Sequence, residues 1–248
     1  MSQRWSVSEN GTRPAAPPQA MRNTSAPRGQ PLPFWGSSVQ PERLAAVLKH
    51  APAGARILDL GTGRGAYVDE LSRSGFSVVG CDIHLYPEWL GRSSRRFVVG
   101  HAAALPFRPA SFDATIAFEV LEHCPEPRKV LEAIARCTTG HVILSVPDCN
   151  LDNALRRHDL AMAHWTDPSH CSFFTRASLL ELVEGCGLRV VDLSPCCRIS
   201  PNAYFWDTIR LPRLLRRAAE KTCEKLHLVE TYWSSILVVA RTEGSSAP

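Results

Sequence analysis

Apolar residues occur along most of the chain in two alternating patterns, short runs and helical stripes. Short runs bounded by turn residues are typical of buried strands, whereas apolar residues spaced three and four positions apart are typical of helices that bury one face. The stripes predict a helix that begins at Pro41, with Leu44, Val47 and Leu48 on its apolar face, and further helices near residues 67–71, 130–134 and 178–186. The runs predict strands at residues 56–60, 76–81, 96–99, 112–118, 141–146, 188–193 and 234–240.

Strands separated by helix-length segments indicate right-handed strand–helix–strand units and a mainly parallel sheet. At 248 residues the chain is long enough for one such α/β domain. We expect this domain at residues 39–242, with an insertion at about 195–232 before the last strand. Residues 1–38 are rich in Pro, Ser and Arg without apolar periodicity, so we expect a disordered tail there, and a short second tail at 243–248.

Composition narrows the class of protein and its partners. The chain is 44% hydrophobic and 21% charged, as globular proteins are, and its net charge is +4. So mild a charge leaves nucleic-acid binding open without favouring it. Basic clusters that could serve such binding are Arg92, Arg95 and Arg96, and Arg213, Arg216 and Arg217.

The cysteines and the lengths of the apolar runs indicate in which cellular compartment the protein is expected. Nine scattered cysteines show no CxxC pair, and several lie in apolar runs, which favours buried free thiols and a reducing compartment. No apolar run reaches about 18 residues, so we expect no membrane span. The first 30 residues lack the apolar core of a signal peptide. Their arginines and serines leave a mitochondrial transit peptide conceivable, but a cytoplasmic protein with a disordered tail is favoured.

A glycine-rich loop follows the strand predicted at 56–60. Gly61, Gly63 and Gly65 open the next helix, and such glycines let the backbone approach a ligand without a Cβ clash. Asp82 ends the second predicted strand, where a carboxylate can accept both hydroxyl hydrogens of an adenosine ribose. These features fit NAD as well as S-adenosylmethionine. Asp59, two residues before Gly61, favours the latter, because it could hold an ammonium group that NAD lacks.

Five short phrases then follow in order: residues 57–65 (ILDLGTGRG), 79–83 (VGCDI), 104–107 (ALPF), 111–113 (SFD) and 119–123 (EVLEH). With this order and spacing, residues 56 to about 193 resemble the class I S-adenosylmethionine-dependent methyltransferases of the type 11 group. The resemblance implies a Rossmann-like α/β fold with helices on both faces of a seven-stranded sheet, in the order 3-2-1-4-5-7-6 with the seventh strand antiparallel.

The same resemblance assigns roles around the cofactor. Asp59, Gly61 and Gly63 would line its methionine end, within a loop completed by Gly65. Asp82, followed by Ile83, would hold the ribose, Ala102 would lie beside the adenine, and Glu119 would contact the cofactor. The family usually has an acidic residue where this chain has His101. The chain therefore departs from the family at this expected adenine contact.

Glu119, Glu122 and His123 stand where the fourth predicted strand ends. At spacings of three and four, one helical turn would place them on one face. His170 lies after the fifth strand, in a loop expected at the carboxyl edge of the sheet. Two carboxylates and two imidazoles are ligands that Mg, Mn or Zn accept. We therefore expect a divalent metal at Glu119, Glu122, His123 and His170, or catalysis by His123, His170 and Glu122 without one, or structural roles.

Two methyltransferase families have a similar Glu-x-x-Glu-His followed by a distant His. They are the ubiquinone-pathway O-methyltransferases and the small-RNA 3′-terminal 2′-O-methyltransferases. In the second family the later His begins a His-x-Phe-x-x-Thr phrase. The corresponding residues 170–175 (HCSFFT) have one more residue between His and Phe, so the match is imperfect. We expect O-methylation of a small hydroxylated metabolite, sugar or quinone precursor. The alternatives are RNA 3′-terminal 2′-O-methylation with a metal site, a catalytically silent methyltransferase-like module, and an NAD-dependent oxidoreductase.

Overall fold

The computed structural model describes residues 38–91, 96–151, 167–199 and 232–242, together with isolated positions between 212 and 226. Most of both predicted tails and of the predicted insertion lies outside these residues. So do five of the six arginines of the two basic clusters, all but Arg96.

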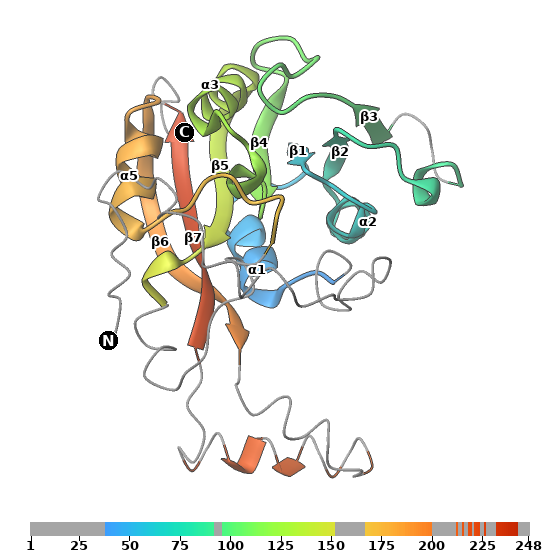
Figure 1. Cartoon of the computed structure of the whole chain (residues 1–248). Coiled ribbons are helices and arrows are strands. Elements are labelled where there is room, and N and C mark those ends of the chain that lie inside the picture. Colours follow the sequence, from blue (N-terminus) through green and yellow to red (C-terminus); the bar gives the residue numbers. More distant parts are fainter. Residues whose placement is uncertain are drawn as a thin grey trace.

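Seven strands of the described residues form one sheet in the order β3-β2-β1-β4-β5-β7-β6 (Figure 1). The first five are parallel, and β7 runs antiparallel to both β5 and β6. This is the predicted sheet, so the predicted fold class is confirmed. The strands are β1 Arg56–Leu60, β2 Ser77–Asp82, β3 Phe97–Val99, β4 Phe112–Phe118, β5 Thr138–Pro147, β6 Leu188–Ile199 and β7 Tyr232–Thr242.

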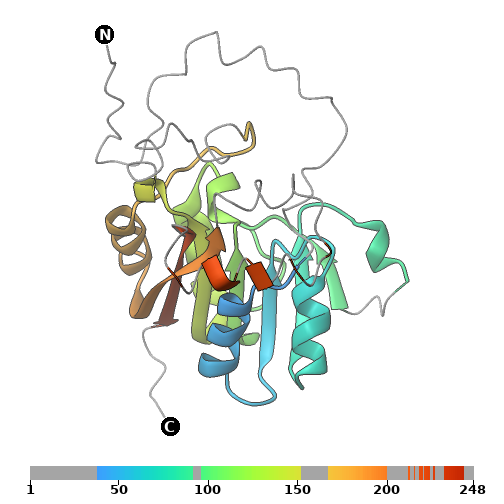
Figure 2. The same cartoon turned by 90° about the horizontal axis from the view of Figure 1, so that it is seen from below.

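Helices cover both faces of the sheet (Figure 2). Helices α1 (Pro41–His50) and α2 (Ala66–Arg73) lie on one face, and α3 (Pro127–Cys137) and α5 (Arg176–Glu184) lie on the other. Successive residues of a strand point to opposite faces, so Ile57 packs in the α1/α2 core and Leu58 in the α3/α5 core. Strands buried on both faces are near-continuously apolar, which explains why the sequence showed them as runs.

Local signals fix where the helices begin. Proline occupies the first turn of α1 and α3, where its missing N–H has no intrahelical partner to lose. Thr175 caps α5: its side chain accepts a hydrogen bond from the Ser178 amide, and the Ser178 side chain accepts one from the Thr175 amide. This capping box makes α5 begin two residues before the predicted helix.

Two elements differ from the prediction in ways that have physical reasons. Strand β6 extends to Ile199, well past the predicted end at 193, although it contains Pro195. Because β6 is the last strand of the sheet, a proline there need not break a ladder hydrogen bond. In α1, Leu48 is 49% exposed, and the core-facing positions are Val47 and Arg43. The predicted apolar face of α1 is therefore wrong at Leu48.

The expectation of buried free thiols holds for four of the nine cysteines. All nine cysteines are free thiols; Cys81, Cys137, Cys149 and Cys196 are buried, whereas Cys171 is exposed. Within the described part of the chain, every helix is too short or too polar to cross a membrane.

Candidate active site

The glycine loop turns tightly at the carboxyl end of β1. Gly61, Gly63 and Gly65 all have positive φ angles, a conformation that glycine adopts without steric cost. The amides of Gly61 and Thr62 both donate to the carbonyl of Cys81 in β2, at 2.8 and 3.2 Å, so the loop is fixed to the neighbouring strand. Gly65 then forms the N-cap of α2, whose first amides face the loop.

Asp59 lies beneath this loop and is almost completely buried. The Thr62 hydroxyl donates to its Oδ2 at 2.6 Å. Burial raises the pKa of Asp59 to about 7; the nearby Asp82 adds to this rise, and the Thr62 hydrogen bond opposes it. Asp59 therefore changes its charge near neutral pH, at the place where the sequence predicts contact with the methionine end of the cofactor.

The Asp82 carboxylate stands at the end of β2 and faces the same loop. It accepts hydrogen bonds from the amides of Gly63 at 2.9 Å and His84 at 3.0 Å, one on each oxygen. A carboxylate has about four acceptor positions, so capacity remains for the two hydroxyls of a ribose. Two backbone amides thus fix the orientation of the Asp82 carboxylate beside the glycine loop, and its ribose contact stays a prediction.

The residues predicted near the rest of the cofactor lie beside this edge. Ile83 is 57% exposed, as a side chain available to cover a ligand would be, and Ala102 is half-buried against the core. His101 turns its ring back to the chain, because its Nδ1 accepts a hydrogen bond from the Ala103 amide at 3.2 Å. The roles of Ile83 and Ala102 at the cofactor stay predictions.

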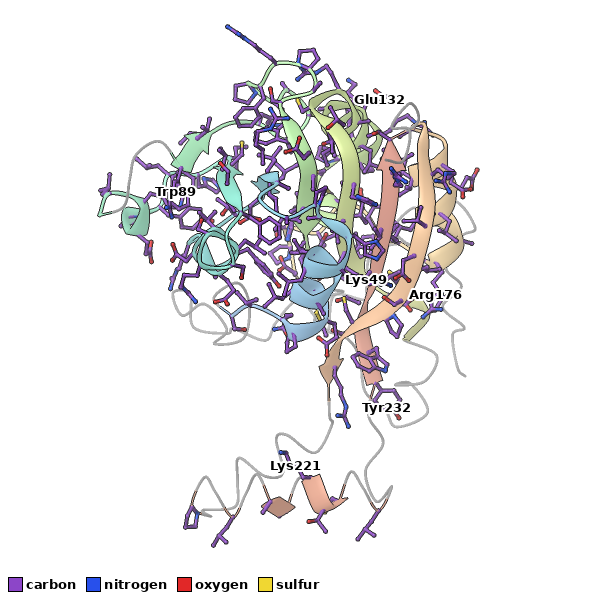
Figure 3. All side chains as sticks on the ribbon, turned by 180° about the vertical axis from the view of Figure 1, so that it is seen from behind. Lys49, Trp89, Glu132, Arg176, Lys221 and Tyr232 are labelled. Carbon is purple, nitrogen blue, oxygen red and sulfur yellow. The ribbon has the colours of Figure 1, made fainter. Side chains whose placement is uncertain are left out.

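Trp89 supports the glycine loop from the side and was missed by sequence reasoning. Its indole N–H donates to the carbonyl of Gly63 at 2.8 Å, and its ring stacks on Phe97 with 4.8 Å between centroids. Figure 3 labels Trp89 among the side chains of the whole molecule. A single tryptophan between two strands gives no pattern that would have predicted this contact.

The second part of the site begins where β4 ends. Val120 packs directly on Gly61, so closely that a Cβ at Gly61 would collide with its side chain. The glycine loop and the segment 119–123 are therefore in contact. This contact brings the predicted cofactor loop next to the predicted catalytic residues.

Glu119 adopts a positive φ of 55° and is not part of the short 3-10 helix Leu121–His123 that follows. Its carboxylate forms an ion pair with Arg43 of α1 and accepts a hydrogen bond from Ser145 at 3.0 Å. Among the described residues, Glu119 is not part of the cluster that Glu122, His123 and His170 form, although its charge acts on Glu122. A helical face shared by Glu119, Glu122 and His123 was the wrong expectation, because the chain turns between Glu119 and the helix.

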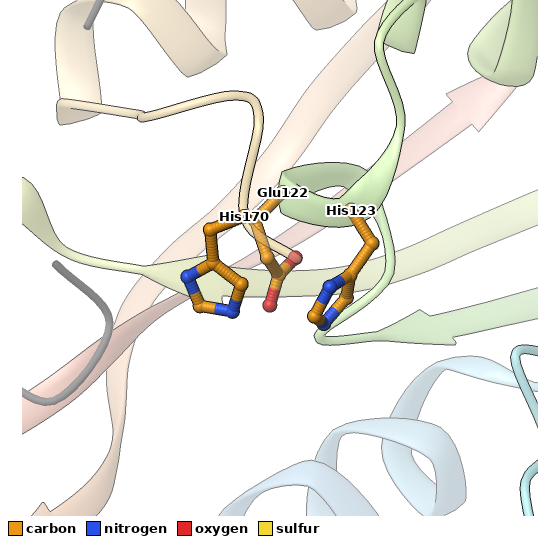
Figure 4. Close-up of side chains that lie close together, drawn as sticks. All are labelled: Glu122, His123 and His170. Carbon is orange, nitrogen blue, oxygen red and sulfur yellow. The ribbon is translucent and has the colours of Figure 1, made fainter. Parts of the chain in front are cut away.

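Glu122, His123 and His170 do come together (Figure 4). Their ligand-type atoms lie within 4.8 Å of one another, and the two imidazole rings meet edge to face with 4.6 Å between centroids. His123 is exposed, whereas Glu122 is buried and neither of its oxygens accepts a hydrogen bond from a described residue. Burial, and then the charge of Glu119, raise the pKa of Glu122 well above its usual range.

The loop that carries His170 is tied to the helix that carries His123. The amides of Cys171 and Ser172 donate to the carbonyl of Glu122 at 2.8 and 3.0 Å. Ser169 also contacts His123, with 3.0 Å between its hydroxyl oxygen and Nδ1. The sequence interpretation assigned no role to Ser169, although its neighbour His170 had been singled out.

The described site thus combines a glycine loop, the Asp82 carboxylate that faces it, and the segment 119–123, which contacts the loop through Val120 and carries His123. Residues 37–193, more than half of the chain, match the family described as a methyltransferase domain. The chain belongs to the S-adenosylmethionine-dependent methyltransferases. The predicted family is therefore confirmed, and S-adenosylmethionine is the methyl donor that the family implies.

Other methyltransferases resemble this one over most of its length. The ubiquinone biosynthesis O-methyltransferase of Vibrio cholerae is 30% identical over 193 residues, which span 70% of this chain and 76% of that protein. The protein of the same name from Ralstonia nicotianae is 30% identical over 188 residues, which span 63% of this chain and 75% of that protein.

Solved structures agree on the fold. The 1,6-didemethyltoxoflavin-N1-methyltransferase of Burkholderia thailandensis has a TM-score of 0.55 and 18% identity, covering 82% of this chain and 77% of that one. A SAM-dependent methyltransferase from Archaeoglobus fulgidus has the same score and identity and covers 81% and 92% of the two chains. At such identities the likeness concerns the fold alone.

Proposed function

We propose that this methyltransferase methylates a hydroxyl oxygen of a small molecule and that His123 is the general base. The observation that carries the proposal is the exposed imidazole of His123, three residues after Val120, whose side chain packs on the cofactor loop at Gly61. A hydroxyl acceptor must lose its proton during transfer, whereas a neutral amine need not lose one beforehand. An imidazole in this position is suited to that task.

The chemistry of the step balances with these groups. When bound, S-adenosylmethionine supplies a methyl group: a C–O bond forms to the acceptor as the C–S bond breaks, S-adenosylhomocysteine is left, and the hydroxyl proton passes to His123. The remaining catalysis is positioning of the acceptor against the cofactor loop. The two relatives named as ubiquinone biosynthesis O-methyltransferases support an oxygen acceptor on a small molecule.

A divalent metal held by Glu122, His123 and His170 is a second candidate means of activating the hydroxyl. What favours it is the closeness of the three ligand-type atoms and the buried Glu122 oxygens, which accept no hydrogen bond from a described residue. One carboxylate and two imidazoles suit Zn or Mn, and such an ion would lower the pKa of a bound hydroxyl. This part of the metal prediction stays a prediction.

The experiment is a methyl-transfer screen with S-adenosylmethionine against catechols, phenols, sugars, amines and RNA 3′ ends, with mass analysis of each product. We expect a methyl ether on a small acceptor. His123→Ala should lower kcat for that acceptor by roughly 100-fold or more. The matched control is His141→Ala, because His141 lies near the opposite end of the sheet. Methylation of RNA ends alone, or of nitrogen alone, would replace the proposal.

The metal alternative is tested on the same protein. After purification in the presence of Mg, Mn or Zn, metal content is measured and activity is assayed with and without EDTA. Substoichiometric metal and unchanged activity are expected if His123 acts alone as the base. Activity that EDTA abolishes and Mn or Zn restores would favour the metal. Cofactor binding without turnover on any acceptor class would support a catalytically silent module.

A further inference from the structure

Ser169 lies between a carboxylate and an imidazole. Its hydroxyl oxygen is 2.5 Å from Oδ1 of Asp167 and 3.0 Å from Nδ1 of His123. A serine hydroxyl has one proton and can donate only one strong hydrogen bond, although it can accept others. The direction in which Ser169 donates therefore decides which nitrogen of His123 carries its proton.

The Ser169 hydroxyl donates its hydrogen bond to Asp167 and not to His123. A carboxylate can only accept, so two oxygens 2.5 Å apart need a proton from the hydroxyl between them. The 2.5 Å contact is a hydrogen bond from the Ser169 hydroxyl to Asp167, and it uses the only proton that the hydroxyl has. With its proton donated to Asp167, Ser169 must accept from His123.

We propose that Asp167 and Ser169 are positioning residues that hold neutral His123 with its proton on Nδ1 and the lone pair of Nε2 free to act as a base. The order of donation is Nδ1–H of His123 to Ser169, and Ser169 to Asp167. The catalytic role of this arrangement rests on the proposed function. The assignment of the His123 proton to Nδ1 does not. Asp167 would also stabilise the imidazolium that forms when Nε2 accepts the proton of the hydroxyl.

The surrounding contacts hold this arrangement in place. The amide of Ser169 donates to the same Oδ1 of Asp167 at 2.9 Å, so serine backbone and side chain both bind one carboxylate oxygen. The other oxygen, Oδ2, lies 3.8 Å from Nε2 of His170. The ring of His170 packs edge to face on His123, which limits rotation of the base. The arrangement thus fixes both the orientation and the tautomer of His123.

The direct test is ¹⁵N NMR of the histidine side chains in the cofactor-free protein, at a pH where His123 is neutral. We expect His123 to be protonated on Nδ1 in the wild type. Ser169→Ala removes the acceptor, and Asp167→Ala frees the serine proton to point at Nδ1, so both should lose this preference. The matched control is Ser172→Ala, because the Ser172 hydroxyl donates instead to the carbonyl of Cys124. Wild-type protonation on Nε2, or an unchanged tautomer in Ser169→Ala, would overturn the proposal.

Kinetics test the consequence. Ser169→Ala should lower kcat about 10-fold or more with little change in KM, and Ser169→Thr, which keeps a hydroxyl, should restore most of it. The double variant Asp167→Ala/Ser169→Ala should lose no more than Ser169→Ala, because both act through one chain of hydrogen bonds. Additive losses, or an equal loss in Ser172→Ala, would contradict it. If the NMR result holds but no hydroxyl is methylated, the proposed function fails and the positioning of His123 remains.

Discussion

Arg43 of α1 forms an ion pair with Glu119, which directly follows β4 and lies 76 positions later in the chain. Both side chains are largely removed from solvent, at 9% and 16% exposure. Burial alone would lower the pKa of Arg43, but the charge of Glu119 raises it, so the guanidinium stays charged. Glu119 has a left-handed backbone conformation, with a φ of 55°, and the next residue, Val120, packs on Gly61. The first helix is thereby coupled to the geometry of the site.

Breaking this pair should be costly. Arg43→Met leaves the Glu119 carboxylate buried without its partner, and the loss of one member of a buried pair lowers the free energy of unfolding by about 3–5 kcal/mol. Arg73→Met breaks the pair with Glu70, in which Arg73 is 69% exposed, and should cost about 1 kcal/mol or less. Urea unfolding of the ligand-free variants measures both. Similar losses in the two variants would show that burial of the first pair does not matter.

The second prediction concerns Gly80, whose missing side chain makes room for Thr62. A Cβ at Gly80 would lie 2.8 Å from both Cγ2 and Oγ1 of Thr62 and 3.0 Å from the ring of Phe97. Gly80→Ala should therefore displace Thr62 from Asp59, weaken cofactor binding and destabilise the fold by about 1–3 kcal/mol. Gly91→Ala is the control, because no heavy atom of a described residue lies within 4 Å of its added Cβ. Thermal unfolding with and without cofactor would separate the two variants.

The third prediction concerns Asp82. Removal of a carboxylate that accepts two ribose hydroxyls costs about 1.5–3 kcal/mol for each hydrogen bond. Asp82→Ala should accordingly weaken S-adenosylmethionine binding by roughly 100-fold or more, as measured by calorimetry. Asp113→Ala removes a carboxylate from the opposite end of the sheet, where it pairs with Arg56, and should leave the affinity unchanged. An equal affinity in wild type and Asp82→Ala would remove Asp82 from the cofactor site.

The sequence predicted the sheet well because burial on both faces leaves a strong signal. The predicted strands 56–60 and 112–118 coincide with β1 and β4, whose apolar runs end at polar or turn residues. The grouping of Glu122 and His123 with His170 could also be predicted, since the carboxyl ends of parallel strands meet at one edge. For the same reason, the glycine loop and Asp82 were assigned to one site.

What the sequence could not predict depends on contacts between distant positions. Arg43 stands in an amphipathic helix where a charged residue normally faces water, and its partner is in another element. The positive φ of Glu119 is unusual for a residue other than glycine, and no turn residue at this position indicates it. Ser169 and His123 are 46 positions apart, and contacts between their two segments, among them the backbone hydrogen bonds to Glu122, bring them together. No local pattern carries this information.

The last prediction is a pH dependence of cofactor binding that Asp59 imposes. Burial raises the pKa of Asp59 to about 7 in the ligand-free protein, so the carboxyl is mostly protonated at pH 6 and mostly ionised at pH 8. If its ionised form holds the cofactor ammonium, affinity should rise with pH, by about fivefold between pH 6 and pH 7, because the ionised fraction rises by that factor. Asp59→Asn cannot ionise, so its weaker binding should be flat over this range. Calorimetry at pH 6, 7 and 7.5 measures both proteins, and Asp192→Asn, at an exposed pair with Lys49, is the control that should keep the wild-type dependence. Affinity that falls with rising pH in the wild type, or an equal slope in Asp59→Asn, would mean that Asp59 supports the loop through Thr62 without binding the cofactor.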